Sequence, residues 1–268
     1  MLAQWRDAIG RRQRSVETLE LESLRRYALA IGGNGDVEQR QPALPHWAFF
    51  LPRPTDGDLG ADGHARRGGF LPPVSLPRRM FAGSSITFVA PLLLAAEAEM
   101  TATIVDVAHK SGRSGDLVFV DLENELVQQG SIRVTERKRF VYRAEEANAA
   151  PPVLPQPCPE APSGELWEPT TTHLFRFSAA TFNAHRIHYD APYAAQVENY
   201  PSLVVHGPFT AAKLAALAER AGALTKFEFR AQAPLFQGQP IRLQADRNEV
   251  RAVRCDGVTA MVATVGYA

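Results

Sequence analysis

The chain has 268 residues, of which 29 are basic, 29 are acidic and 45% are hydrophobic. The balanced charge gives no overall attraction for nucleic acid, and the length suits one large domain or two domains of ordinary size. The two cysteines, Cys158 and Cys255, form neither a disulfide framework nor a CxxC metal pair, which favours a reducing compartment.

The N-terminal segment and the longest apolar run argue against export and membrane insertion. Residues 1–15 (MLAQWRDAIGRRQRS) lack the apolar core of a secretory signal. The apolar run at residues 86–96 is too short to span a bilayer and contains Pro91. We therefore expect a cytoplasmic protein without a membrane partner.

The first half of the chain predicts one helix followed by an antiparallel sheet. Apolar residues recur at helical spacing over residues 21–31, and the glycines that follow end the helix. Residues 41–79 are dense in proline and glycine, which predicts a long irregular segment of the kind that often carries function. Alternation and β-branched residues then predict strands beginning at residue 86 and at 101–107, 116–126 and 131–142.

Six prolines between residues 151 and 162 predict an extended linker at 146–165, dividing a domain at 1–145 from one at 166–268. The second half predicts a strand at 170–177, a helix at 209–221 that Gly222 caps, and strands at 226–233, 241–245, 250–255 and 258–267. Alanine fills six of the positions from 211 to 221, so this helix can approach closely to a curved sheet. Together the halves predict an α+β fold, a tandem double hot-dog in which each half wraps a sheet around a helix.

Residues 177–209 hold three of the seven histidines, His185, His188 and His206. Their neighbours Asn183 and Tyr189 are poor helix formers, which predicts a loop or strand. A neutral imidazole at His188 could act as a general base near neutral pH. The side-chain amide of Asn183 could hold a water or a substrate hydroxyl, or it could simply cap a turn.

The His206-Gly207 pair stands at the start of the alanine-rich helix. A helix N-terminus has free N–H groups and a partial positive charge, and glycine leaves its own N–H open to approach. Gly207 is therefore a candidate donor to a carbonyl oxygen that becomes negative, although close packing at the helix start is the alternative reading. His206 more often hydrogen-bonds the backbone than reacts in such a position.

The segments NAHRIHYD at 183–190 and HGP at 206–208 resemble the signature of the MaoC-like, or hydratase-2, hot-dog dehydratases. The chain is most similar to the branch that includes 3-hydroxyacyl-thioester dehydratases and mesaconyl- or itaconyl-CoA hydratases. The first half shares with this branch the segments LPHW at 44–47, DGH at 62–64, GFLP at 69–72 and KSGRSG at 110–115.

The resemblance implies reversible hydration of an enoyl thioester of CoA or acyl carrier protein, without a metal or redox cofactor. It assigns His188 as the base, Asn183 as the group that positions water, and Gly207 as the oxyanion donor. It further implies that the N-terminal domain is non-catalytic and that the protein forms a homodimer.

The main departure from the wider family is Asn183, because the family's catalytic aspartate falls there and an amide cannot take a proton. Asp190 follows His188 by two residues, and on a strand both would face the same side, so Asp190 is the candidate for the missing carboxylate. The candidates for substrate binding are Arg186, His206, Lys110 and Arg113. The last two lie in a basic turn that either contacts a CoA or pantetheine phosphate or is ordinary solvated surface.

Two other functions stay open at this point. Hot-dog folds also host acyl-CoA thioesterases, for which Asp190 or Glu198 could activate water. A non-catalytic acyl-thioester binding module is the third reading. His185 and His188 could ligate a metal, but no further ligand at a recognised spacing accompanies them. The sequence leaves both short dicarboxylic and medium linear acyl chains open; a branched acid would require an arginine, for which Arg176, Arg186 and Arg230 are candidates.

Overall fold

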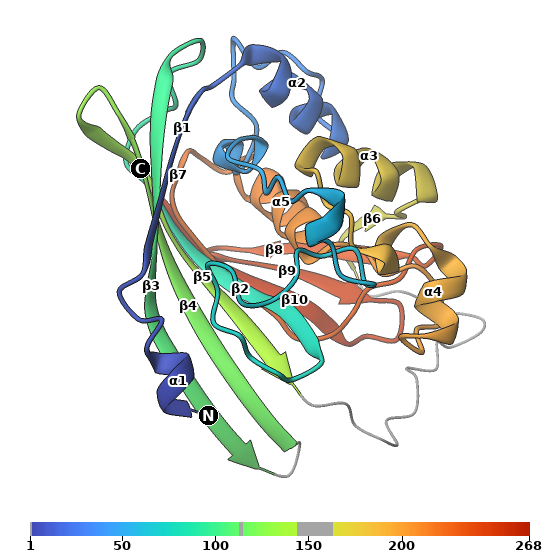
Figure 1. Ribbon diagram of the computed structural model, residues 1–268. Coiled ribbons are helices and arrows are strands. Elements are labelled where there is room, and N and C mark those ends of the chain that lie inside the picture. The colour runs from blue at the N-terminus through green and yellow to red at the C-terminus, as the bar shows by residue number, and fades with distance from the viewer. Residues whose placement is uncertain (1, 113–114, 144–162) are drawn as a thin grey trace.

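The computed structural model describes residues 2–112, 115–143 and 163–268 (Figure 1). In this part of the chain ten strands form one antiparallel sheet in the order β1-β3-β4-β5-β2-β7-β10-β9-β8-β6. The strands are β1 Arg12–Thr18, β2 Arg78–Phe88, β3 Glu97–Gly112, β4 Gly115–Gln128, β5 Ser131–Arg143, β6 Glu165–Trp167, β7 Leu224–Ala231, β8 Ile241–Asp246, β9 Glu249–Arg254 and β10 Thr259–Tyr267. The helices are α1 Leu2–Arg6, α2 Leu21–Ala30, α3 Thr171–Thr181, α4 Ala191–Gln196 and α5 Gly207–Ala218, with short 3₁₀ turns at Pro45–Ala48, Asp56–Asp58 and Arg186–His188.

The two halves of the chain meet where β2 pairs with β7, so that five strands from each half make one continuous sheet. Gly83 of β2 lies opposite Arg230 at this junction. A Cβ atom at Gly83 would come within 2.2 Å of the carbonyl oxygen of Phe229, so the close approach requires glycine. The sequence predicted β7, but it placed the start of the facing strand at residue 86, whereas β2 begins at Arg78 and pairs with β7 from Gly83.

Helix α5 lies against the concave face formed by β7 to β10 (Figure 1). Its alanines at 211, 212, 215 and 218 are buried together with Leu214, as the alanine-rich pattern predicted. The helix begins at Gly207 and ends at Ala218, and its C-cap Glu219 has an ordinary right-handed conformation. The prediction that Gly222 caps the helix is therefore wrong, because the chain has already left the helix before it.

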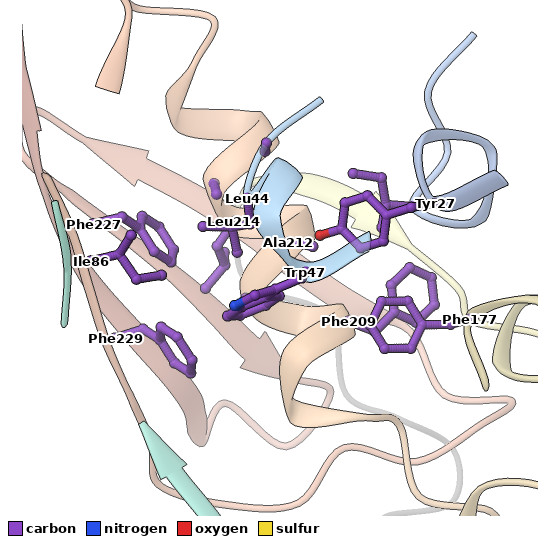
Figure 2. Close-up of a cluster of buried hydrophobic side chains, with 14 of the residues drawn as sticks. Tyr27, Leu44, Trp47, Ile86, Phe177, Phe209, Ala212, Leu214, Phe227 and Phe229 are labelled. Carbon is purple, nitrogen blue, oxygen red and sulfur yellow. The ribbon is translucent and has the colours of Figure 1, made fainter. Parts of the chain in front are cut away.

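Helix α2, predicted correctly, packs mainly against α3 and the Pro45–Ala48 turn. The start of the irregular segment also reaches the core, where Leu44, Trp47 and Phe49 are buried. Figure 2 shows Trp47 between α5 and the sheet, and its ring contacts Phe229 edge-on with centroids 6.0 Å apart. Buried aromatic side chains thus fix the irregular segment in place.

A buried carboxylate anchors the same segment to the sheet. Glu136 of β5 accepts hydrogen bonds from Trp47 Nε1 at 3.1 Å and Ser84 Oγ at 2.8 Å, and it lies 3.2 Å from both His46 Nε2 and Lys138 Nζ. Burial alone would raise the pKa of Glu136. The Lys138 charge and the bonds from His46 and Ser84 outweigh burial and lower this pKa to about 2.

The predicted strand at 170–177 is instead helix α3. Thr170 and His173 cap its first turn reciprocally, each side chain accepting the other residue's backbone N–H. Leu174, Phe177 and Ser178 are then buried on one face at helical spacing. This cap and this buried face override the preference of threonine and phenylalanine for strands.

Residues 146–162 of the predicted linker lie outside the described residues, and residue 165 already belongs to β6. The division of the chain into domains at 1–145 and 166–268 stays a prediction. Across the described ranges, none of the helices combines the length and the apolar composition needed to traverse a lipid bilayer.

Candidate active site

An open cleft of about 2030 Å³ is lined by residues from both halves of the chain. Its wall includes the irregular segment before β2, parts of β2 and β5, and the loop between α3 and α5. His188, Asn183 and Gly207 all line this cleft, together with His185. The fold therefore brings the main residues predicted from the sequence to one surface.

His188 is only 7% exposed, and the orientation of its ring is fixed from behind. Its Nδ1 lies 2.7 Å from the carbonyl oxygen of Val204. Because a carbonyl only accepts, Nδ1 donates, and the neutral ring carries its free electron pair on Nε2. Burial lowers the pKa of His188 to about 3, although the bond to Val204 opposes the shift, so the ring is neutral and able to accept a proton at neutral pH.

His206 lies directly behind His188, with the two rings stacked 3.6 Å apart between centroids. It is fully buried, and its Nε2 lies 2.9 Å from Ser178 Oγ. Burial lowers its pKa well below the ordinary value. The structure thus places His206 under the His188 ring and not on the cleft wall, so we do not expect it to contact substrate.

Gly207 is the first residue of α5, and its backbone N–H has no acceptor within the helix. A Cβ atom added at Gly207 would meet nothing within 4 Å. Close packing is therefore not the reason for this glycine. The open space leaves the N–H accessible to an oxygen atom in the cleft, which favours the oxyanion reading.

Asn183 follows the end of α3, and the chain turns there as a loop, as predicted. Its Oδ1 accepts the backbone N–H of His185 at 3.0 Å, so the side chain does cap a turn. Its Nδ2 has no acceptor among the residues that the structure describes, and Asn183 lines the cleft. The amide can therefore still donate to a water or a substrate oxygen.

Sequence reasoning missed two residues that the structure brings to this site, Asp62 and His64 of the irregular segment. The carboxylate Oδ2 of Asp62 lies 3.2 Å from His64 Nδ1, and Oδ1 accepts the backbone N–H of His64 at 3.0 Å. The His64 ring lies beside the His185 ring, with centroids 4.0 Å apart and the ring planes tilted by 40°. Burial alone would raise the pKa of Asp62, but the hydrogen bonds and charge of His64 hold it far below its usual range.

Comparison with known proteins places the chain in a family. Residues 43–237 match the family model described as hydroxyacyl-thioester dehydratase type 2. The chain is 42% identical over 274 aligned residues to mesaconyl-C(4)-CoA hydratase of Chloroflexus aurantiacus, covering 98% of each protein. The chain belongs to the hydroxyacyl-thioester dehydratase type 2 family. It is therefore a hydratase or dehydratase that acts on acyl thioesters.

Solved structures support the fold. HtdX of Mycobacterium tuberculosis, at 17% identity, superposes with a TM-score of 0.67 over 95% of this chain and 99% of its own. A second protein of the same organism, described as having a double hot-dog fold, superposes with a TM-score of 0.56 at 12% identity, over 96% of this chain and 95% of its own. The predicted tandem double hot-dog is confirmed.

The position of Asp190 in this family member differs from the prediction. Asp190 is the N-cap of α4, where Oδ1 accepts the N–H of Tyr193 at 3.0 Å, and it does not lie on a strand with His188. Its Oδ2 pairs with Arg186 through Nε at 3.0 Å and Nη2 at 2.8 Å. Neither residue lines the cleft, so Asp190 does not replace the missing carboxylate and Arg186 is not free for substrate.

The basic residues of the cleft also differ from those predicted. Lys110 is exposed near the end of β3, with its ammonium over the Phe119 ring, and Arg113 lies outside the described residues. Exposed Arg176 and Arg230 do not line the cleft either. The cations that do line it in β2 and β5 are Arg78, Arg79, Lys138 and Arg143. Arg78 and Arg79 fell in the segment predicted to be irregular, and the strand predicted at 131–142 did not show which of its faces would border the cleft.

Asp62, His64 and His185 also form a grouping in which one donor atom from each lies within 4.8 Å of the others. From the sequence we expected no metal, because no further ligand at a recognised spacing accompanied His185 and His188. The structure supplies Asp62 and His64 as further candidate ligands beside His185. However, the Asp62 carboxylate already contacts both the backbone N–H and the ring Nδ1 of His64, and an Nδ1 that carries a proton cannot ligate a metal. The geometry fits a carboxylate–imidazole pair better than a metal cage.

Proposed function

We propose that this enzyme adds water reversibly across the C=C bond of an enoyl-CoA whose acyl group carries a second, free carboxylate, with mesaconyl-C4-CoA as the candidate substrate. The 42% identity to a hydratase of that substrate along the whole chain supports this choice. The cationic side chains of β2 and β5 that border the cleft suit an anionic acyl group.

The observation that carries the chemistry is the position of His188 and Gly207 on one cleft wall. In hydration, Asn183 and His188 hold a water near the β-carbon, and His188 Nε2 removes a proton as the oxygen bonds to that carbon. The electrons of the double bond move toward the thioester oxygen. The N–H of Gly207 and the positive end of α5 stabilise the negative charge that develops there. Protonation of the α-carbon completes the reaction.

The first test is direct. Purified protein is given mesaconyl-C4-CoA and crotonyl-CoA, and the loss of the conjugated enoyl absorbance is followed. We expect mesaconyl-C4-CoA to be consumed. His188→Gln should lower kcat by roughly 100-fold or more because it removes the base. His109→Gln, an exposed histidine away from the cleft, is the matched control and should keep full activity.

A thioesterase is the second candidate, because Glu198 lines the cleft and could activate water against the carbonyl. Glu198 lies 3.8 Å from Arg78 Nε and 3.4 Å from the Tyr193 hydroxyl. Release of free thiol from acyl-CoA, without loss of the enoyl absorbance first, would support the thioesterase and overturn the hydratase. The use of CoA instead of acyl carrier protein, the homodimer and the cytoplasmic location stay predictions, and light scattering tests the dimer.

A further inference from the structure

Hydration requires two proton movements, one from the attacking water and one onto the α-carbon. The residue that aligns with the family's catalytic aspartate is Asn183, whose Oδ1 is held by His185 and whose Nδ2 can only donate a hydrogen bond. His188 supplies one proton-transferring group. The site therefore needs a second such group from elsewhere in the chain.

The Asp62–His64 pair has the geometry of such a group. Because a carboxylate only accepts, the 3.2 Å contact fixes the proton of His64 on Nδ1 and leaves Nε2 for proton exchange. Both side chains remain accessible from the cleft, 27% exposed for His64 and 36% for Asp62. The negative charge of Asp62 stabilises an imidazolium when one forms at His64.

The turn that carries this pair is attached firmly to the loop that carries His188. The backbone N–H of Arg186 donates to the carbonyl of Asp62 at 2.9 Å, and Arg186 Nη1 donates to the carbonyl of Ala61 at 3.0 Å. Gly63 has a φ of +84°, and a Cβ atom there would come within 1.9 Å of the Ala184 carbonyl oxygen. Two hydrogen bonds and a glycine contact thus fix a segment of the first half against the catalytic loop of the second.

His185 lies between the two histidines. Its ring centroid is 4.0 Å from that of His64 and 5.3 Å from that of His188. Burial, together with the neighbouring His64, lowers the pKa of His185 to about 3, although Asp62 opposes the shift. A neutral ring therefore separates His64 from His188.

We propose that Asp62 and His64 form a dyad in which His64 is the second catalytic acid–base, taking the part that the wider family gives to an aspartate, while Asp62 positions it. This inference rests on the proposed hydratase function. It makes the N-terminal half a contributor to the chemistry, whereas the sequence predicted a non-catalytic domain.

In the hydration direction, His188 and His64 each transfer one proton. His188 Nε2 takes one proton from water, the hydroxyl oxygen bonds to the β-carbon, and the electron pair of the C=C bond moves into an enolate. The protonated His64 gives its Nε2 proton to the α-carbon, and the enolate electrons form the new C–H bond. His188 then returns its proton and His64 regains one through solvent, for which the exposure of His64 is sufficient.

The charged and titratable groups around His64 are Asp62 on its own turn, His185 and His188 on the facing loop, and Arg79 of β2, whose charge acts on His185. Of these groups, Asp62 accepts hydrogen bonds from both the backbone N–H and the ring Nδ1 of His64.

The test compares His64→Gln, Asp62→Asn and Asp62→Glu with the wild type on mesaconyl-C4-CoA. We expect His64→Gln to lower kcat by about 100-fold with little change in KM. The amide introduced by Asp62→Asn would keep the bond to the His64 backbone but would place an N–H₂ group opposite Nδ1, which disfavours the working tautomer and lowers kcat similarly. Asp62→Glu should restore part of the activity.

The matched control is His109→Gln, because His109 and Asp116 form a similar pair at 3.0 Å outside the cleft. Wild-type kcat in His64→Gln, or no recovery of activity in Asp62→Glu relative to Asp62→Asn, would overturn the dyad even if the wild type is an active hydratase. A wild type that hydrates no enoyl-CoA would instead overturn the proposed function. Loss of wild-type activity to a chelator, with recovery on adding Zn²⁺, would replace the dyad by a metal site.

Discussion

Replacing Gly63 with alanine tests the attachment of the first half to the catalytic loop. Alanine at a φ of +84° costs roughly 1–2 kcal/mol of folding free energy. The new Cβ would also lie 1.9 Å from the Ala184 carbonyl oxygen, so one backbone must move. Such overpacking costs roughly 1–3 kcal/mol, and loss of the bond from Arg186 to Asp62 adds about 1 kcal/mol.

Gly257 provides the matched control, because it has the same φ of +84° but a Cβ there would meet nothing within 4 Å. Gly257→Ala should therefore show only the conformational cost, and the two variants should differ by roughly 2–4 kcal/mol in the free energy of unfolding measured with urea. Gly63→Ala should also lose most of its kcat, since the turn carries Asp62 and His64. Equal destabilisation of the two variants, with full activity in Gly63→Ala, would refute the contact.

The remaining predictions concern stability and the oxyanion donor. Glu136→Gln should destabilise the fold by about 3 kcal/mol at neutral pH, because Lys138 and His46 lose a buried charged partner. The folded-state pKa of Glu136 is lowered to about 2 from an ordinary value of 4.5, so its contribution is fully present above pH ~4.5 and is lost as the pH falls toward 2. Urea titrations between pH 2 and 7 measure how the free energy of unfolding depends on pH. The same dependence in the wild type and in Glu136→Gln would contradict this role of Glu136. Gly207→Ala should fold with nearly wild-type stability, since its Cβ enters open space, yet lose roughly 10- to 100-fold in kcat as the methyl group covers the N–H. A Gly207→Ala variant with unchanged kcat would rule out this donor.

Local pattern was sufficient for most of the elements. The strand predicted at 226–233 agrees with β7 to within two residues at each end. The prediction succeeds because buried Phe227 and Phe229 alternate strictly with exposed charged residues. The strand predicted at 170–177 was wrong, because the helix found there depends on capping and packing interactions that residue propensities do not describe. There the reciprocal cap between Thr170 and His173 starts a helix, and burial of Leu174 and Phe177 in the shared core holds it.

The site divides in the same way. His188, Asn183 and Gly207 could be grouped from the sequence because they occur in one short stretch whose order resembles a known signature, and all three line the cleft. Asp62 and His64 occur in the DGH segment at 62–64, which resembles the same family branch but carries no sign of a catalytic role in the sequence. Their approach to this loop is made by a contact between residues 125 positions apart, Arg186 with Ala61, for which the sequence holds no periodic signal. Asp190 was misplaced for a related reason, since its role as a helix cap depends on where α4 begins.

A chain of contacts therefore links the sheet of the first half to the chemistry of the second. Glu136 on β5 holds Trp47, which fixes the start of the irregular segment. Further along that segment, the turn at Asp62 bonds to Arg186, two residues before His188. Substitutions in the first half that weaken the attachment of the Asp62 turn to Arg186 should accordingly lower kcat, even where they lie outside the cleft. If instead the second half carried the whole mechanism, loosening the turn would reduce stability and leave kcat of the folded fraction unchanged, so the two quantities must be measured on the same variants.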